Sequence, residues 1–149
     1  MYQNLCFAVG VIITNNKKTL FYLQQKDEKY QIPVFRQSYC FFGGGIEPEE
    51  DEHQALKREL LEELEPTSAE IIYKSSKKLF DNYIQNIMKE NYKFSLYEAV
   101  LPNKKLMEIS KFPVKEGRGV LIKRENILNI FFMADLNSTL AKYLIKKIN

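Results

Sequence analysis

The apolar positions of the chain divide it into short strands separated by polar turns, with helical spacing in two longer segments. Residues 5–13 form a continuous apolar run rich in β-branched side chains, which is typical of a strand buried on both faces. A polar turn at residues 14–18 leads into the apolar residues 20–24, the expected hairpin partner. Aromatic residues alternate through residues 92–101 and predict another strand. Shorter strands are expected at residues 39–42, 70–73, 77–80 and 119–123.

The clearest helical spacing begins at Glu50 or Asp51 and ends near Leu64. Acidic residues at the start suit a helix N-terminus, because its unsatisfied N–H groups and its dipole favour negative charge. Pro66 prevents the helix from continuing and disfavours helical geometry at the residue before it. One apolar stripe along this helix is expected to face a core and consists of Ala55, Leu56, Leu60 and Leu64.

The last part of the chain predicts a brief helix at residues 124–128 and a longer one at residues 134–148. Asp135 or Asn137 is a candidate cap for the longer helix. Its apolar face is expected to comprise Leu136, Leu140, Leu144, Ile145 and Ile148.

Two stretches, residues 25–38 and 102–117, are predicted to be long loops because proline, glycine and charged residues punctuate them. Residues 81–90 fit either a hairpin loop or one or two helical turns. The sequence has no internal repeat and no linker, so residues 1–149 are expected to form a single mixed α/β (α+β) domain.

Charge is distributed unevenly along the chain. Residues 47–65 contain nine acidic residues against Lys57 and Arg58, a net charge of −7, so the remainder carries +10 to give the overall +3. An acidic patch on a basic body suits an anionic substrate that cations bridge to carboxylates, although scattered lysines also serve solubility alone.

The remaining composition indicates a cytoplasmic protein. The sequence has no apolar run long enough to span a membrane, and the first residues lack a basic leader. Cys6 and Cys40 lie in apolar runs without metal-binding spacing, so both are expected to be reduced, buried thiols.

Three carboxylates of the predicted helix, Glu59, Glu62 and Glu63, fall within a sector of about 100° beside its apolar stripe. Carboxylates three and four residues apart repel one another. Arg58 would neutralise part of this charge, through Glu62 or through Glu50 upstream. A hard divalent cation would neutralise the rest, since Mg²⁺ prefers carboxylate oxygen. The alternative is a solvated acidic face without function.

The order of these residues resembles the signature of the Nudix hydrolases. It reads Gly44, five residues, Glu50, seven residues, and then Arg58-Glu59-Leu60-Leu61-Glu62-Glu63. The family pattern continues with glycine and an aliphatic residue, where this chain has Glu65 and Pro66. The resemblance extends to the surroundings of this stretch, and it implies the Nudix fold, a mixed β-sheet sandwiched between α-helices.

The resemblance also implies roles for individual residues. Glu59 and Glu63 would be the central ligands of Mg²⁺, with Mn²⁺ as the alternative ion. Glu62 would complete the set, and Gly43 would offer its backbone carbonyl. Arg58 would orient a glutamate, with Glu50 as the expected partner. The general base varies within the family. Glu116 on a late loop is the first candidate, and Glu98 in a predicted strand is the second, with outward solvation as its alternative.

The implied reaction is Mg²⁺-dependent hydrolysis of a pyrophosphate bond in a nucleoside diphosphate or triphosphate derivative, which would be a small-molecule substrate. Phe35 and Tyr39 are candidates for stacking on a base, with core packing as the alternative, and Gly44 and Gly45 would lie beside the substrate. The lone His53 is expected on the apolar flank of the helix, without a catalytic role. A homodimer is possible, because many relatives are dimers.

Two other functions remain open at this stage. One is removal of a 5′ diphosphate from RNA, with a phosphate backbone following basic residues in the second half of the chain: Lys104, Lys105, Lys111, Lys115, Arg118 and Lys123. The other is a non-catalytic, Nudix-like module that senses a nucleotide. Such a module would be expected to have lost acidic residues that this chain retains.

Overall fold

The structure, a computed structural model, describes residues 5–86, 88–133 and 136–148. Its strands are β1 (Cys6–Asn15), β2 (Leu20–Gln25), β3 (Tyr39–Cys40), β4 (Phe42–Gly45), β5 (Ser76–Gln85), β6 (Asn91–Leu101) and β7 (Arg118–Lys123). The α-helices are α1 (Glu52–Glu63), α2 (Pro66–Ser75), α3 (Asn103–Ser110) and α4 (Leu136–Ile148). Two short 3₁₀ helices, η1 (Pro33–Phe35) and η2 (Arg124–Asn129), complete the described elements.

Strand β1 is the centre of one mixed sheet. It runs parallel to β6 along its whole length, and β5 pairs antiparallel with the far side of β6. On its other side β1 divides its pairing. Residues Ala8 to Val11 pair with β4, whereas Ile13 and Thr14 pair with β2, which also carries β3 and β7. The division opens the sheet between β4 and β2.

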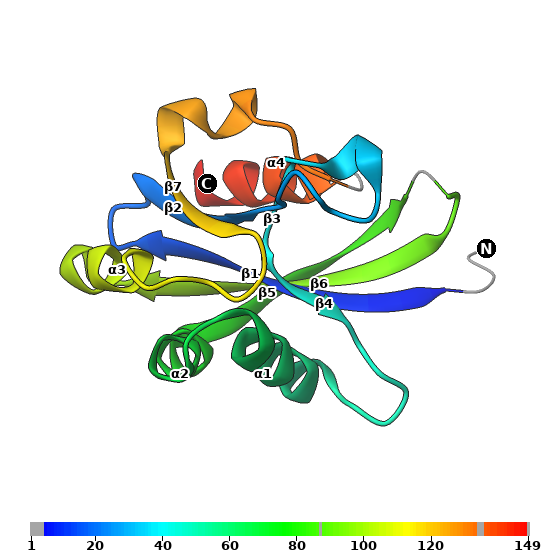
Figure 1. Ribbon diagram of the computed structural model, residues 1–149, viewed down its shortest axis with the longest axis horizontal. Coiled ribbons are helices and arrows are strands. Elements are labelled where there is room, and N and C mark those ends of the chain that lie inside the picture. The colour runs from blue at the N-terminus through cyan, green and yellow to red at the C-terminus, as the bar shows by residue number, and fades with distance from the viewer. Residues whose placement is uncertain (1–4, 87, 134–135, 149) are drawn as a thin grey trace.

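Helices cover both faces of this sheet, as the resemblance predicted (Figure 1). One core lies beneath α1 and α2, where Val9, Val11 and Ile13 of β1 face Leu56 and Leu60 of α1. A second core lies beneath α4 and contains Ile12 of β1, Phe21 and Leu23 of β2, and Leu140 and Tyr143 of α4. Alternate residues of β1 therefore serve opposite cores, which explains its continuous apolar sequence.

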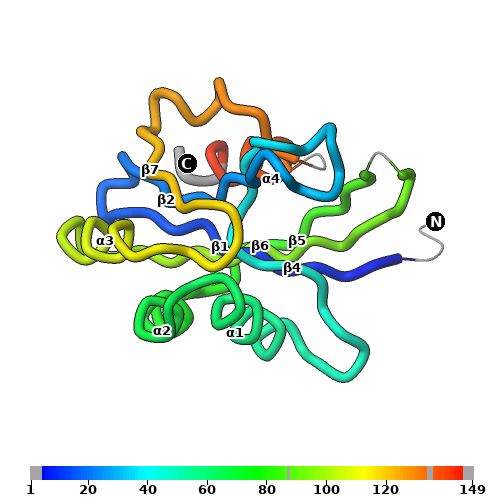
Figure 2. Tube along the Cα trace, in the orientation of Figure 1, coloured from blue at the N-terminus to red at the C-terminus, as the bar shows by residue number. Residues whose placement is uncertain are grey.

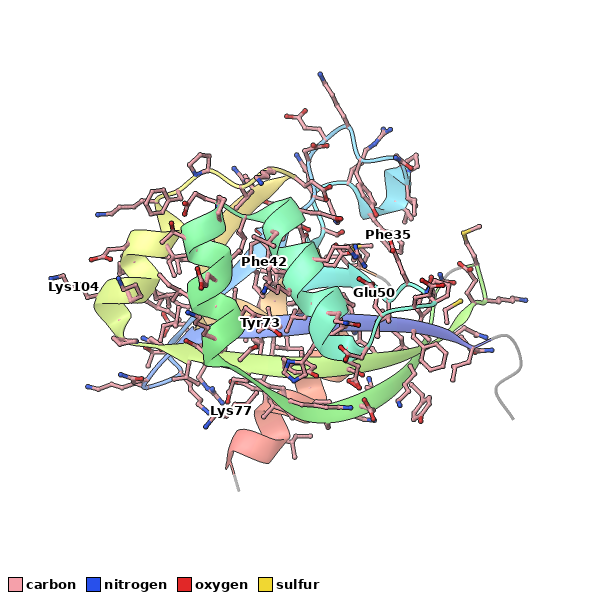
Figure 3. All side chains as sticks on the ribbon, turned by 90° about the horizontal axis from the view of Figure 1, so that it is seen from below. Phe35, Phe42, Glu50, Tyr73, Lys77 and Lys104 are labelled. Carbon is pink, nitrogen blue, oxygen red and sulfur yellow. The ribbon has the colours of Figure 1, made fainter. Side chains whose placement is uncertain are left out.

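Two predicted elements were wrong. Residues 70–73, predicted as a strand, lie within α2, which follows α1 almost directly and packs beside it (Figures 2 and 3). The Glu65 side chain caps α2 by accepting hydrogen bonds from the N–H groups of Thr67 (3.0 Å) and Ser68 (3.1 Å), and Pro66 is its first residue. Glu65 and Pro66 therefore end one helix and begin another. The loop predicted at 102–117 contains α3, and only its second part is irregular.

The remaining expectations agree with the structure at most positions. The stretch predicted at 81–90 contains the turn between β5 and β6, but residues 81–85 are still part of β5, and α1 ends at Glu63. Helix α4 begins at Leu136, so Asn137 lies inside it and is not its cap, while Asp135 falls outside the described residues. Leu136, Leu140 and Leu144 are buried, but Ile145 is 62% exposed, and the Ile148 side chain lies outside the described part.

Candidate active site

Helix α1 is fixed by its cap and by its buried stripe. The Asp51 side chain accepts the Gln54 N–H (2.8 Å) while the Gln54 side chain accepts the Asp51 N–H (2.9 Å), a reciprocal capping box. Ala55, Leu56 and Leu60 are fully buried against the sheet. The rotation of the helix is thereby set, and its acidic residues lie beside the glycines of β4.

Glu63 is the most deeply buried of these acidic side chains, at 2% exposure. One carboxylate oxygen, Oε1, accepts the Gly43 N–H at 2.8 Å, and Oε2 accepts a hydrogen bond from Gln24 Nε2 at 2.8 Å. Burial raises the pKa of Glu63 to about 8, although the Gly43 hydrogen bond opposes that shift. The site therefore favours a proton or a cation on this carboxylate.

Glu59 lies directly against the glycine strand. A Cβ added at Gly44 would stand 2.4 Å from Glu59 Oε1, so a side chain there would displace the carboxylate. Gly43 has φ +146°, and its added Cβ would stand 2.1 Å from the Val9 carbonyl oxygen. Burial also raises the pKa of Glu59, against the opposing effect of Arg58. The glycines thus allow carboxylates and backbone to meet closely.

Arg58 joins the loop to the helix, as expected. Its Nε and Nη2 donate to the two carboxylate oxygens of Glu50 at 2.8 and 2.7 Å, a bidentate pair. Hydrogen bonds from Arg58 hold the pKa of Glu50 down at about 2. The remaining nitrogen, Nη1, donates to Glu59 (3.0 Å) and to Glu62 (3.3 Å), whose side chain is 54% exposed. Both partners proposed from the sequence are therefore engaged.

Glu116 lies near the helix because its loop is tied to the end of α1. The Lys115 N–H donates to the Glu63 carbonyl oxygen at 2.8 Å, and Lys115 Nζ donates to the Leu61 carbonyl oxygen at 3.0 Å. The Glu116 carbonyl oxygen accepts from Gln24 at 3.2 Å. The charge of Glu116 contributes to the raised pKa values of Glu59 and Glu63. This exposed glutamate therefore belongs to the same cluster.

Glu98, the second candidate base, lies on the other face of the sheet. It is 7% exposed, accepts a hydrogen bond from the Tyr143 hydroxyl of α4, and pairs with Lys18 at 3.0 Å. Its neighbours Tyr97 and Ala99 belong to the core beneath α1, so strand alternation directs Glu98 the opposite way. Both predictions for Glu98, catalysis and outward solvation, were wrong.

A cleft of about 380 Å³ opens beside the glycines of β4. Gly43, Gly44 and Gly45 form one wall, and Lys26 lies at the rim shared with the acidic cluster. Aromatic and methionine side chains line about half of the rest: Tyr30, Phe35, Phe41, Met88, Tyr92, Phe94 and Met133. Phe35 is among the lining residues, whereas Tyr39 is not and packs against the core beneath α4.

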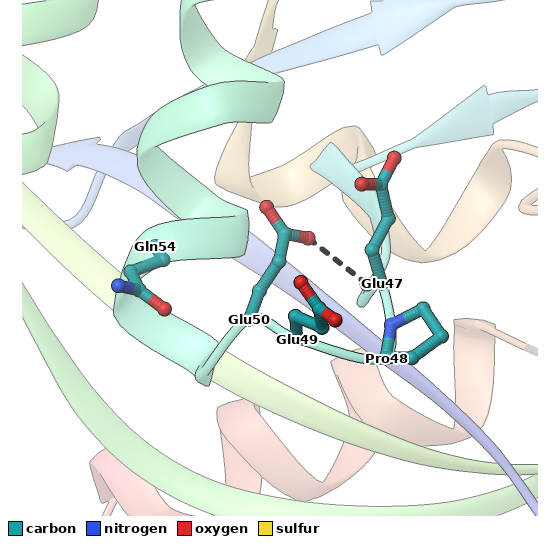
Figure 4. Close-up of a pocket in the computed structure, with 5 residues that line it drawn as sticks. All are labelled: Glu47, Pro48, Glu49, Glu50 and Gln54. Atoms are coloured by element: carbon teal, nitrogen blue, oxygen red, sulfur yellow. Dashed lines mark hydrogen bonds between the residues drawn. The ribbon is translucent and has the colours of Figure 1, made fainter.

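A larger hollow of about 600 Å³ lies on the outer side of the loop before α1 and is lined by Glu47, Pro48, Glu49, Glu50 and Gln54 (Figure 4). Glu50 accepts the Glu47 N–H there at 2.9 Å and is already paired with Arg58. None of these five lining residues is aromatic or basic.

Residues that the sequence did not single out complete the cluster. Gln24 is fully buried on β2, and its Oε1 accepts from Lys26 Nζ at 3.0 Å and from the Cys40 thiol at 3.1 Å. Burial raises the pKa of Cys40 to about 12, so this thiol stays protonated. Cys6 is only partly buried, and neither cysteine forms a disulfide. The signal in the sequence that could have identified Gln24 is its polar amide at the end of the otherwise apolar run of residues 20–24.

His53 packs against aromatic rings. This agrees with its expected place on the apolar flank of the helix. Its ring meets Tyr97 edge-on at 5.3 Å and Tyr73 at 6.0 Å between centroids. This packing leaves it apart from the acidic cluster.

Among the helices of the described ranges, none is both long and apolar enough to cross a membrane.

The family model of the NUDIX domain matches residues 5–109 of this chain. The chain belongs to the NUDIX family. It is accordingly a hydrolase that acts on phosphoric anhydrides, as the resemblance implied. The comparison with curated proteins finds no match.

Solved structures with the same fold include three relatives of low identity. An Ap4A hydrolase from C. elegans is 20% identical over 95% of this chain and 98% of its own, with a TM-score of 0.64. A MutT protein from Methanosarcina mazei is 14% identical over 89% of this chain and 87% of its own, with a TM-score of 0.59. A bifunctional NMN adenylyltransferase/ADP ribose pyrophosphatase from Francisella tularensis is 16% identical over 100% of this chain but 43% of its own, with a TM-score of 0.65. These identities support the fold alone.

Proposed function

We propose that this NUDIX hydrolase uses Mg²⁺ to cleave a pyrophosphate bond in a nucleoside diphosphate or triphosphate derivative. The observation that supports this most directly is the contact between the acidic cluster, through its buried member Glu63, and an aromatic cleft. Gly43 donates its N–H to Glu63 and also lines the cleft. An anhydride bound at this boundary would have carboxylates on one side and a nonpolar pocket on the other.

The chemistry of the acidic cluster fits a hard divalent cation. Glu59 and Glu63 both have pKa values raised by burial, and a cation would offset that cost. No three acidic, histidine or cysteine side chains of the described part already stand in a metal-binding arrangement. In this arrangement Arg58 Nη1 occupies the space between Glu59 and Glu62. The guanidinium can yield Nη1 and keep its two bonds to Glu50. Glu59, Glu62 and Glu63 would then hold Mg²⁺ together with the Gly43 carbonyl, as the family resemblance implies. Mn²⁺ is the alternative ion for the same ligands.

The cleft fits the other half of such a substrate. A nucleobase is flat and apolar on its faces, and stacking on aromatic side chains is worth about 1–3 kcal/mol per base. Among its aromatic lining residues, Tyr30 and Tyr92 are partly exposed, whereas Phe35 and Phe41 are almost fully buried. Lys26 Nζ lies at the rim, beside the acidic cluster, where it would contact a phosphate oxygen. Gly44 and Gly45 would let the diphosphate approach the backbone.

The residues then divide the reaction between them. Mg²⁺ held by Glu59, Glu62 and Glu63 would supply positive charge to neutralise the diphosphate and polarise the phosphorus. Glu116, which is exposed and tied to the end of α1, would accept the proton of the attacking water. The oxygen of this water forms a bond to one phosphorus while the bond from that phosphorus to the bridging oxygen breaks. The bridging oxygen leaves with the second phosphorus. The products are a nucleoside monophosphate and either pyrophosphate or a phosphorylated second group. Arg58 keeps Glu50 and the loop in place throughout.

A panel assay tests this proposal. The protein is incubated with Mg²⁺ and nucleoside triphosphates, nucleotide sugars, dinucleoside polyphosphates, ADP-ribose and 5′-triphosphorylated RNA, and phosphate-containing products are followed. The names of the Ap4A hydrolase and the ADP ribose pyrophosphatase support including two of these compounds. Turnover of a small nucleotide is the expected result. Turnover of RNA alone would favour the 5′ pyrophosphohydrolase, and binding without turnover would favour a sensor.

A further inference from the structure

Gln24 is a fully buried amide that follows four apolar or aromatic residues in β2. It lies on β2, two residues after Tyr22, and shares the face of the sheet covered by α1. A buried amide without partners would destabilise the fold by roughly 1–3 kcal/mol. Gln24 avoids this cost, because both of its polar atoms are hydrogen-bonded twice.

The partners fix which way the amide points. Oε1 accepts from Lys26 Nζ (3.0 Å) and the Cys40 thiol (3.1 Å), and an ammonium group can only donate. Nε2 donates to Glu63 Oε2 (2.8 Å), an acceptor when the carboxylate is ionised, and to the Glu116 carbonyl oxygen (3.2 Å), which can only accept. A flipped amide would place oxygen against a carboxylate and a carbonyl and NH₂ against an ammonium. The orientation is therefore determined by four neighbours together.

These neighbours come from separate parts of the site. Glu63 belongs to α1, Glu116 to the loop before β7, Cys40 to β3, and Lys26 to the rim of the cleft. Gly43 N–H holds one oxygen of Glu63 and Gln24 holds the other. Each oxygen retains a lone pair with which to bind a cation. Gln24 is thus the side chain through which the acidic helix, the Glu116 loop and the cleft are joined.

We propose that Gln24 is a positioning residue of this hydrolase, which sets the orientation of the Glu63 carboxylate and holds the loop that carries Glu116. The inference rests on the proposed function, because it takes Glu63 as a metal ligand. Partners of metal ligands typically change metal affinity or activity by about 10- to 100-fold when they are removed. Gln24 acts through Glu63 and Glu116 and does not itself touch the reacting atoms.

The first test is Mn²⁺ binding to Gln24→Leu in the absence of substrate, measured by titration with detection of free Mn²⁺ by electron paramagnetic resonance. Leucine keeps a similar volume and removes all four hydrogen bonds. We expect the dissociation constant of Mn²⁺ to rise about 10-fold or more. In turnover assays kcat should fall by a similar factor while KM for the nucleotide changes little, because the aromatic cleft is intact. Gln24→Met serves as a second variant if Gln24→Leu does not fold.

Gln25→Leu is the matched control. Gln25 is also buried and adjacent, but it lies on the opposite face of the sheet, where it donates to the Gln37 carbonyl oxygen and accepts from Arg118. Its Mn²⁺ affinity should equal that of the wild type. An equal loss of affinity in both variants would overturn the inference, because it would reflect damage to β2 alone.

Other outcomes separate this inference from the function on which it rests. Wild-type Mn²⁺ affinity and kcat in a folded Gln24 variant would overturn the positioning role, provided that Glu63→Gln loses Mn²⁺ binding. Undiminished Mn²⁺ binding in Glu63→Gln would overturn the metal assignment itself. If neither Gln24 variant folds, the residue is structural and the inference is wrong.

Discussion

Glu50 and Glu63 show how surroundings give one residue type two roles. Arg58 donates two hydrogen bonds to Glu50, through Nε and Nη2, and the pKa of Glu50 falls to about 2, so it remains an anion. Glu63 has no arginine partner and is buried, and its pKa rises to about 8. The first carboxylate anchors Arg58, whereas the second gains most from a cation. Carboxylates with pKa values pushed apart often divide structural and chemical work in this way.

Replacing Glu63 by glutamine should reduce turnover by roughly 100-fold or more, because a neutral amide is a poor ligand for Mg²⁺. The fold should persist, since the glutamine carbonyl can still accept the Gly43 N–H. Steady-state kinetics and circular dichroism would measure both effects. Glu70→Gln is the control, because Glu70 is an exposed residue of α2 that pairs with Lys74 at 2.9 Å. Near-normal turnover in Glu63→Gln would refute the metal assignment.

Gly44→Ala should weaken Mn²⁺ binding by about 10-fold at little cost in stability. The added methyl group would stand 2.4 Å from Glu59 Oε1, and the carboxylate, at the end of a flexible side chain, can move away. Movement of the Glu59 carboxylate would displace a proposed metal ligand but leave the fold unchanged. Gly45→Ala is the comparison, because its Cβ would meet nothing within 4 Å. Mn²⁺ titration of both variants decides the matter, and equal affinities would argue against Glu59 as a ligand.

At the scale of elements, the sequence predicted α1 well because two independent signals coincide there. An apolar stripe fixes its buried face, and the spacing of Gly44, Glu50 and Arg58 matches a known pattern. Helix α2 was missed because Ile71, Ile72 and Tyr73 have high strand propensity. Burial of Ile72 in the core beneath α1 outweighs that preference.

The network around Gln24 lay beyond sequence reasoning for a different reason. Its partners Glu63 and Glu116 are 39 and 92 positions away, and local spacing says nothing of such pairs. Glu98 illustrates the same limit, because its face of the sheet depends on the register of β6 against β1. The residues of α1 could be predicted, whereas the residues that hold them could not.

Glu65→Ala should lower the Tm by about 2–4 °C, because α2 loses the side chain that caps its first N–H groups. Turnover should be unchanged, since Glu65 is engaged with Thr67 and Ser68 and not with the acidic cluster. Thermal unfolding measures the shift, with Glu70→Ala in the same helix as the control. A large loss of activity without a change in Tm would instead place Glu65 in the site.

For the whole molecule, the division of β1 between β4 and β2 creates the site. Strand β4 brings the glycines, β2 brings Gln24, α1 brings the carboxylates, and the loop before β7 brings Glu116. The region from residue 47 to 65 concentrates negative charge there, while the rest of the chain is basic. Stability and cation binding should therefore be linked through the same carboxylates.

This link predicts how pH acts on the metal-free protein. The pKa of Glu63 is raised in the folded state from 4.5 to about 8, so folding favours the protonated form. The contribution of the protonated Glu63 carboxyl to the free energy of unfolding is complete below about pH 4.5 and is lost as the pH rises through about 8. Saturating Mg²⁺ favours the ionised form and should offset this loss.

The increase in Tm on adding Mg²⁺ should accordingly be small near pH 5 and several degrees near pH 8, as thermal unfolding at a series of pH values would show. In Glu63→Gln both the fall in metal-free Tm across this window and the effect of Mg²⁺ should shrink; an unchanged dependence on pH would assign the linkage to other groups.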